Sequence, residues 1–198
     1  MLNKPIKNSV KLLSGLLILS VVSAIIVVNA VSLVLHTLYP KEYSDSVEKY
    51  AQEYGVDEAL LYALIECESG FDKNAVSSVC AKGLTQITPE TFNWLQTKTG
   101  ESYAEDALFE PEISFKYGAF FLGLLLEEFG DTKTALAAYH AGRGQVNKWL
   151  VNPEYSSDSK KLDKIPFEDT SAYTEKVMKV KYLYSKIYKM EGEKNADS

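Results

Sequence analysis

Residues 63–91 read ALIECESGFDKNAVSSVCAKGLTQITPET, and they carry the clearest signals in the chain. Leu64 and Glu68 are four residues apart, so they fall on one stripe of a helix that is otherwise apolar. Glu68 is therefore expected to point toward a core or a cleft. Burial there would raise the pKa of its carboxyl, so that it could donate a proton near neutral pH.

A second interpretation of Glu68 must be weighed against this one. A Glu at the end of a helix is usually solvated, and Gly70 could simply terminate the helix. The loop that follows is rich in small residues and ends at Thr88-Pro89, where Thr88 can cap a new helix and Pro89 suits its first turn.

Three blocks of sequence, taken together, resemble a known family. The first block, residues 68–91, contains a Glu-Ser pair, then a serine, then the sequence GLTQ and a proline. The second block, residues 138–142, reads AYHAG, and the third, residues 165–173, reads IPFEDTSAY. In this order they resemble the catalytic domain of the soluble lytic transglycosylases, whose blocks are ES, GLMQ, AYNAG and IPxxET-xx-Y. The resemblance extends over roughly residues 43–188.

The resemblance implies a lysozyme-like helical fold and peptidoglycan glycan strands as substrate, cut between N-acetylmuramic acid and N-acetylglucosamine. Glu68 would be the sole catalytic carboxyl, acting first as acid and then as base, and the product would be a 1,6-anhydro sugar. Ordinary glycosidases use two carboxylates, and the sequence supplies no obvious second one. Two alternatives stay open: a lysozyme-type hydrolase, and a weakly active module that binds the cell wall.

By the same resemblance, five further residues would contact the substrate. Ser77 and Gln86 would contact N-acetyl groups and sugar near Glu68, while Tyr139 and Tyr173 would be a pair of cleft tyrosines. Asp169 stands where the family has a glutamate. From the residues alone, Ser77 could equally be a turn residue, Gln86 a partner at a helix entry and the tyrosines core aromatics.

Three departures from the family pattern bear on activity more than on fold. Thr85 replaces a methionine, His140 replaces an asparagine, and Asp169 is one methylene shorter than the usual glutamate. The shorter acid would have to move closer to its partner or act through water.

The N-terminus is almost uninterruptedly apolar over residues 10–35, which is long enough to span a bilayer of roughly 30 Å. Lys4, Lys7 and Lys11 precede or open this run without any acid, so the N-terminal arm is expected in the cytoplasm and the rest outside. A cleaved signal peptide ending near residues 28–30 is the alternative, but the apolar run continues beyond a short signal. The expected protein is thus single-pass in a bacterial cytoplasmic membrane. Its expected parts are an arm (1–9), a transmembrane anchor (10–35), a linker (36–42), a catalytic domain (43–190) and a flexible tail (191–198).

Charge and composition exclude several other function classes. The net charge is −6 and Arg143 is the only arginine, which argues against nucleic acid as a partner. His36 and His140 are far apart in sequence, so a metal site has little support, and no cofactor motif is present.

Cys67 and Cys80 leave two interpretations open. In an exported chain an even pair of cysteines suggests a disulfide, which would tie the loop to the helix that carries Glu68. The alternative is two small free thiols.

The rest of the chain predicts an almost entirely helical domain, because no segment alternates with period two. Asp45 or Ser46 is expected to cap the first domain helix, Asp57 the helix that ends at Glu68, and Thr170 the last helix. Glu66 is expected to face solvent, since it lies about 200° around the helix from Glu68. Expected helices are 46–54, 58–68, 89–99, 111–129, 132–141, 145–150 and 171–190.

Overall fold

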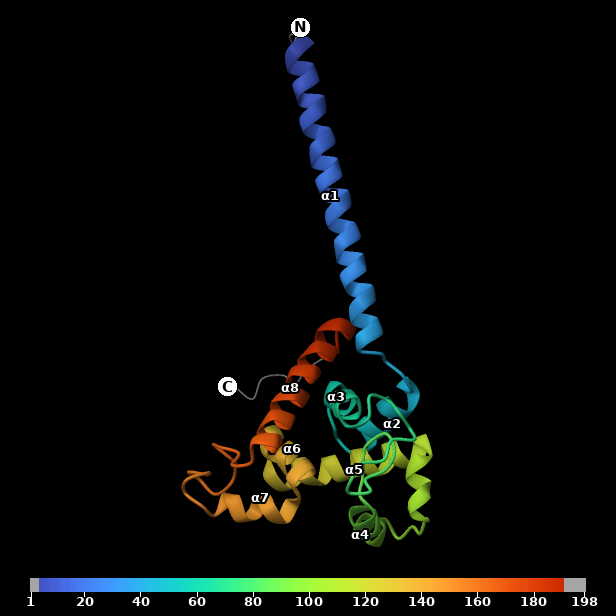
Figure 1. The fold of residues 1–198 in the computed structure, drawn as a ribbon, viewed down its shortest axis with the longest axis vertical. Helices are drawn as coiled ribbons and strands as arrows, with labels where there is room; N and C mark the ends of the chain where they lie inside the picture. The colour runs from blue at the N-terminus through green and yellow to red at the C-terminus, as the bar shows by residue number, and fades with distance from the viewer. Residues whose placement is uncertain (1–3, 191–198) are drawn as a thin grey trace. The chain divides into compact units, whose positions relative to one another are not determined.

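A computed structural model describes residues 4–190 and divides the chain into two compact units, residues 1–40 and 41–198. The first unit is helix α1 (Lys4–Leu38), shown in blue in Figure 1. Its segment Lys11–Leu38 is long and apolar enough to cross a membrane, although a signal sequence near the N-terminus would meet the same criterion. The helix ends at Leu38 rather than at the predicted residue 35. The predicted tail, residues 191–198, lies outside the described residues.

The second unit is helical, as predicted. Between residues 41 and 190 the only β pairing consists of two isolated bridges, Val76 with Lys82 and Lys82 with Ile87. The elements are α2 (Ser44–Glu53), α3 (Glu58–Glu68), α4 (Pro89–Thr99), the 3₁₀ helix η1 (Glu105–Phe109), α5 (Pro111–Phe129), α6 (Thr132–Ala141), α7 (Arg143–Leu150) and α8 (Glu168–Tyr188).

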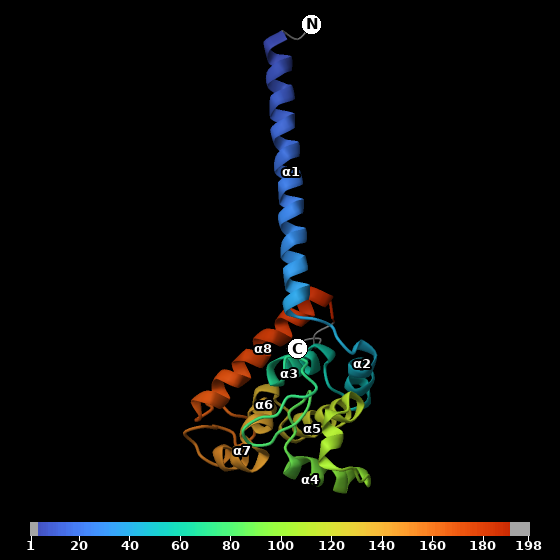
Figure 2. The same ribbon diagram turned by 45° about the vertical axis from the view of Figure 1, so that its right-hand side comes forward.

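Helix α3 forms the centre of this unit. Every residue from Ala59 to Ile65 is buried, and α8 and α2 both pack against α3. Figures 1 and 2 both show α3 between α8 and α2. A helix enclosed on all sides must be apolar all round, which explains the unbroken apolar run before Glu68.

A second apolar cluster holds helices α4, α5, α6 and α7 together. Helix α5 packs against α6, and α6 also packs against α8 and α7. The buried members of the cluster include Phe92 of α4, Tyr117 of α5, Ala138 of α6 and Trp149 of α7. The last turn of α6 is therefore fixed from several directions.

The predicted helix caps are partly right. Asp57 accepts a hydrogen bond from the Leu60 amide at the start of α3, and Thr88 accepts one from the Thr91 amide at the start of α4, with Pro89 in its first turn. Both predictions are confirmed.

The predicted caps of α2 and α8 are wrong. Helix α2 begins after Tyr43 and α8 after Phe167, and neither of these residues makes a side-chain cap bond. The hydroxyls expected to cap are occupied elsewhere: Ser46 donates to Glu112 of α5, and Thr170 lies within α8, where it meets His140. Contacts between helices have replaced the local bonds that the sequence suggests.

Candidate active site

Glu68 is the last residue of α3, and its carboxyl meets Tyr173 of α8. The Tyr173 hydroxyl donates a hydrogen bond of 2.5 Å to Glu68 Oε1. Burial raises the pKa of Glu68 from 4.5 to about 7, while the Tyr173 hydrogen bond and the charge of Lys176 act in the lowering direction. Burial is the largest cause of the shift, since Glu68 is only partly exposed at the end of a helix that is buried from Ala59 to Ile65.

The loop after α3 folds back onto the end of that helix. The Ser69 hydroxyl donates to the Leu84 carbonyl at 2.8 Å, and the Gly83 amide donates to the Ala75 carbonyl at 3.0 Å. Gly83 has φ +74°, and a Cβ there would lie 1.9 Å from the carbonyl oxygen of Leu108. Only glycine allows this loop to pack so closely against η1.

Tyr139, in the last turn of α6, is anchored to the same loop. Its hydroxyl donates a 2.8 Å hydrogen bond to the Thr85 carbonyl, and its ring contacts Phe121 of α5 with centroids 5.0 Å apart. Burial raises the pKa of Tyr139 well above its ordinary value, and the nearby charge of Glu68 raises it further. Glu68, Tyr139 and Tyr173 therefore form one group.

Thr85, one of the departures from the family pattern, is fully buried behind Tyr139. Its hydroxyl donates to the Ser114 carbonyl of α5 at 2.9 Å. Gly118, one turn along α5, makes room for it, since a Cβ there would lie 2.4 Å from Thr85 Cγ2. The threonine is thus accommodated by a specific polar partner and a glycine.

His140 lies beside Tyr173. The two rings stack with centroids 4.4 Å apart and an interplanar angle of 26°. His140 Nδ1 is 3.2 Å from the Thr170 hydroxyl oxygen on α8. This second departure from the family pattern therefore contacts the tyrosine that binds the acid.

A pocket of about 430 Å³ opens next to Tyr139, within the size range of sites for small organic ligands. Phe121, Tyr139 and Trp94 supply its aromatic surface. The complete lining is Thr88, Glu90, Thr91, Trp94, Phe121, Tyr139, His140, Ala141, Gly142 and Arg143. Its lining mixes aromatic and polar groups.

Two of the predicted substrate contacts, Ser77 and Gln86, make hydrogen bonds within the loop that follows α3. The Ser77 hydroxyl accepts from the Ala81 amide at 3.1 Å, and the Gln86 side-chain amide donates to the carbonyls of Ala75 and Gly83 at 3.1 and 2.9 Å. Gln86 adopts φ 49°, a strained left-handed conformation for this residue. Its amide bonds therefore support the loop in that conformation.

Asp169 lies at the start of α8 and is exposed. Its carboxylate accepts a hydrogen bond from the Thr170 amide at 2.8 Å. The contacts of Asp169 are thus with the first turn of its own helix, where a negative charge is favoured.

Both cysteines are free thiols, so the disulfide that the sequence left open is not formed in this structure. Burial raises the pKa of Cys67 to about 11, and the charge of Lys176 acts on it in the opposite direction. Cys67 thus faces α8, whereas Cys80 is exposed in the loop.

Glu66 is partly buried, so it faces solvent only in part. Burial raises the pKa of Glu66, because α8 covers this side of α3 as well.

Two residues near the site were missed from the sequence. Lys176 follows Tyr173 by three residues on α8, so helical spacing could have indicated that both reach the same acid. Trp94 of α4 lines the pocket, and no motif marked it.

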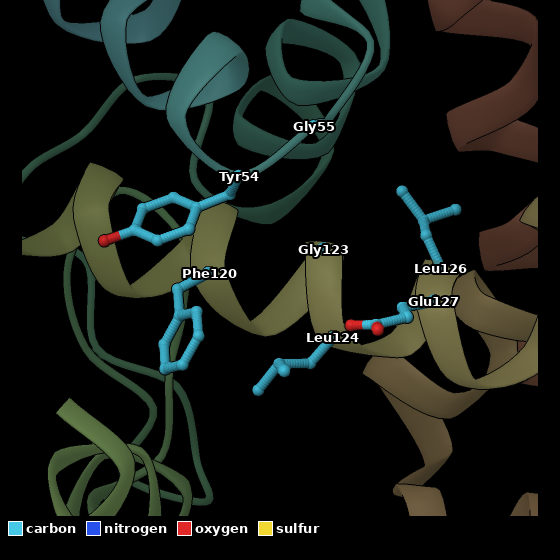
Figure 3. Close-up of a pocket in the computed structure, with 7 residues that line it drawn as sticks. All are labelled: Tyr54, Gly55, Phe120, Gly123, Leu124, Leu126 and Glu127. Carbon is cyan, nitrogen blue, oxygen red and sulfur yellow. The ribbon is translucent and has the colours of Figure 1, made fainter.

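A separate pocket lies on α5 beside the end of α2, as Figure 3 shows. It is lined by Tyr54, Gly55, Phe120, Gly123, Leu124, Leu126 and Glu127. None of the sequence-predicted site residues lines it, so it does not belong to the group around Glu68.

Comparison with known proteins was made against sequence families, curated proteins and solved structures. The family described as Transglycosylase SLT domain matches residues 45–162. The soluble lytic murein transglycosylase of Salmonella typhimurium is 30% identical over 152 residues, covering 73% of this chain and 23% of that protein. The membrane-bound lytic murein transglycosylase C of Haemophilus ducreyi is 31% identical over 119 residues, covering 54% of this chain and 32% of that protein.

Solved structures agree with the sequence comparison. The 70 kDa soluble lytic transglycosylase of Escherichia coli superposes with a TM-score of 0.69 and 26% identity, covering 78% of this chain and 26% of that chain. A complex of the 70 kDa soluble lytic transglycosylase with bulgecin A also gives a TM-score of 0.69. The chain spans about a quarter of the length of these soluble relatives. Because the family match covers more than half of the sequence, this chain belongs to the Transglycosylase SLT domain family.

Proposed function

We propose that this chain is a lytic transglycosylase that cleaves peptidoglycan glycan strands, with Glu68 as its catalytic acid and base. The observation that carries the proposal is the Glu68 carboxyl itself. It is desolvated to a pKa of about 7, fixed through Oε1 by Tyr173, and located in a domain of this family. At neutral pH about half of the molecules then hold the proton that the first step needs.

In the first step Glu68 protonates the glycosidic oxygen. Because Tyr173 donates to Oε1, the neutral acid carries its proton on Oε2. Proton transfer lets the bond between C1 of N-acetylmuramic acid and the leaving oxygen break. The oxygen of the sugar's own N-acetyl group stabilises the positive charge that develops at C1.

In the second step the Glu68 carboxylate takes the proton of the C6 hydroxyl, and the C6 oxygen bonds to C1. The ring closes as a 1,6-anhydro sugar and no water is consumed. Among the described residues, the charged or polar groups that act on the pKa of Glu68 are Tyr173 and Lys176. Neither is a carboxylate, and the proposed mechanism uses one acid in place of the two carboxylates of ordinary glycosidases.

The pocket beside Tyr139 is the proposed binding site for the strand. Trp94 and Tyr139 offer aromatic surfaces to sugar rings, and Thr91 offers a hydroxyl in the first turn of α4. We assign Gln86 and Ser77 to holding the loop, because their side chains make hydrogen bonds within it. Asp169 is assigned to the first turn of α8 for the same reason.

We also propose that residues 10–35 anchor the protein in a bacterial cytoplasmic membrane, with residues 43–190 outside. The support is a single apolar helix and the cluster of Lys4, Lys7 and Lys11 at its N-terminal end. An anchor would hold the enzyme next to the peptidoglycan layer.

A matched pair of variants on one helix tests the role of Glu68. Glu68→Gln keeps the size and polarity of the side chain but removes the transferable proton, so release of glycan fragments from purified peptidoglycan should fall at least about 100-fold. Glu66→Gln makes the same change two residues away and should keep most of the activity. Comparable losses in both variants, with unchanged melting temperatures, would contradict the assignment.

A further inference from the structure

His140 stacks on Tyr173, and Tyr173 donates a hydrogen bond to Glu68, the proposed catalytic acid. The ring centroids are 4.4 Å apart, close to the lower end of the 4.5–7 Å range typical of aromatic pairs. The interplanar angle of 26° means that the imidazole covers the face of the phenol ring.

The backbone on both sides of this stack is fixed. His140 is in the last turn of α6, next to Tyr139, which is bonded to the loop through the Thr85 carbonyl. Helices α6 and α8 pack against each other. The imidazole itself is held by Thr170, which is 1% exposed and one turn before Tyr173 on α8. The ring therefore cannot turn away from Tyr173 without breaking its contact with Thr170.

We propose that His140 is a positioning residue: its ring, oriented by Thr170, holds the Tyr173 phenol in the rotamer that keeps its hydroxyl on Glu68 Oε1. This inference rests on the proposed function only in its predicted effect on kcat. Its predicted effect on the pKa of Glu68 does not depend on that function. The family that this sequence resembles has asparagine at this position, and asparagine has no ring that could stack on the tyrosine. The proposal therefore gives a role to the imidazole itself.

The surroundings of His140 favour a steric and dispersive role over an ionic one. On α8 it meets the neutral groups Thr170 and Tyr173, with Asp169 reaching the Thr170 hydroxyl at 3.5 Å. The charged groups that line the same pocket are Glu90 of α4 and Arg143 of α7, which carry opposite signs. The stack does not require the imidazole to be charged.

Two variants separate the ring from its hydrogen bond. His140→Phe keeps an aromatic face for Tyr173 and loses the bond to Thr170. His140→Asn keeps a polar group that can reach Thr170 and loses the ring. If the stack positions Tyr173, the asparagine variant should lose about 10- to 100-fold in kcat, and the phenylalanine variant should retain clearly more of it. His140 also lines the proposed binding pocket, so the test of positioning is the difference in kcat between the two variants and not KM.

The first readout is independent of catalysis. In full-length protein labelled with ¹³C at glutamate carboxyls, the Glu68 signal is assigned by its absence in Glu68→Gln and titrated with pH. The Tyr173 hydrogen bond lowers the pKa of Glu68, so weakening it in His140→Asn should move the titration above about pH 7, while His140→Phe should not. This result is expected even if the chain cleaves no glycan.

The second readout is kcat and KM on a purified tetrasaccharide of alternating N-acetylglucosamine and N-acetylmuramic acid. Inactive wild-type protein would refute the proposed function and leave the titration to decide the role of His140. An asparagine variant with the wild-type titration would overturn the positioning role. Equal shifts in both variants would overturn it too, because the phenylalanine variant keeps a ring that can stack on Tyr173.

Discussion

The buried carboxyl of Glu68 makes a prediction about stability that needs no substrate. With a pKa of 4.5 when unfolded and about 7 when folded, the native protein binds more protons than the unfolded chain between these values. The free energy of unfolding therefore falls as pH rises from about 4.5 to 7. The total effect is about 3 kcal/mol, because each pKa unit corresponds to about 1.4 kcal/mol.

Glu68→Gln removes this dependence and tests it. The variant should be about as stable as wild type near pH 4.5 and more stable near pH 8, by up to about 3 kcal/mol. Urea denaturation of both proteins at several pH values measures the difference. A difference that stays constant from pH 4.5 to 8 would mean that the carboxyl is not desolvated.

For individual residues, the sequence predicted which side chains belong to the candidate site but not how they contact one another. Spacing and the motifs identified Glu68, Tyr139 and Tyr173, and the structure brings these three together. The stack of His140 on Tyr173 depends on how α6 packs on α8, which no local pattern encodes. Ser77 and Gln86 matched the motif equally well, yet their hydrogen bonds stay inside the loop.

Gly118 of α5 lets the loop before α4 pack closely against that helix. A methyl group there would lie 2.4 Å from Thr85, whose carbonyl anchors Tyr139. Gly118→Ala should therefore destabilise the protein by about 1–3 kcal/mol and lower activity. Gly144→Ala in α7 is the matched control, because a Cβ there meets nothing within 4 Å. Equal unfolding midpoints of the two variants would show that the loop can move away from α5.

Helix positions were more predictable than helix caps. Pro89, Pro111, Gly100 and Gly130 mark α4 and α5 because proline and glycine constrain the backbone whatever the surroundings. Helix caps are harder to predict, because a side chain that could cap a helix can form a hydrogen bond elsewhere instead. Ser46, expected to cap α2, bonds to α5 instead, and this partner is 66 residues away in sequence.

The whole protein is expected to remain in the membrane through residues 10–35. After alkaline carbonate washing, the full-length chain should stay in the pellet, whereas a variant starting at Tyr39 should be released. Protease added to spheroplasts should digest residues 43–190 if these lie outside. A mature, soluble protein that begins at Val31 would instead establish a cleaved signal peptide.

The most direct test of the central claim is the mass of the products that the full-length protein releases from purified peptidoglycan. If the C6 oxygen closes onto C1, muropeptides ending in 1,6-anhydro-N-acetylmuramic acid should accumulate, each lighter by one water than the hydrolysis product, and digestion in ¹⁸O-water should add no label. Glu68→Gln should form neither product. Reducing-end N-acetylmuramic acid carrying ¹⁸O would contradict the account and identify a lysozyme-type hydrolase.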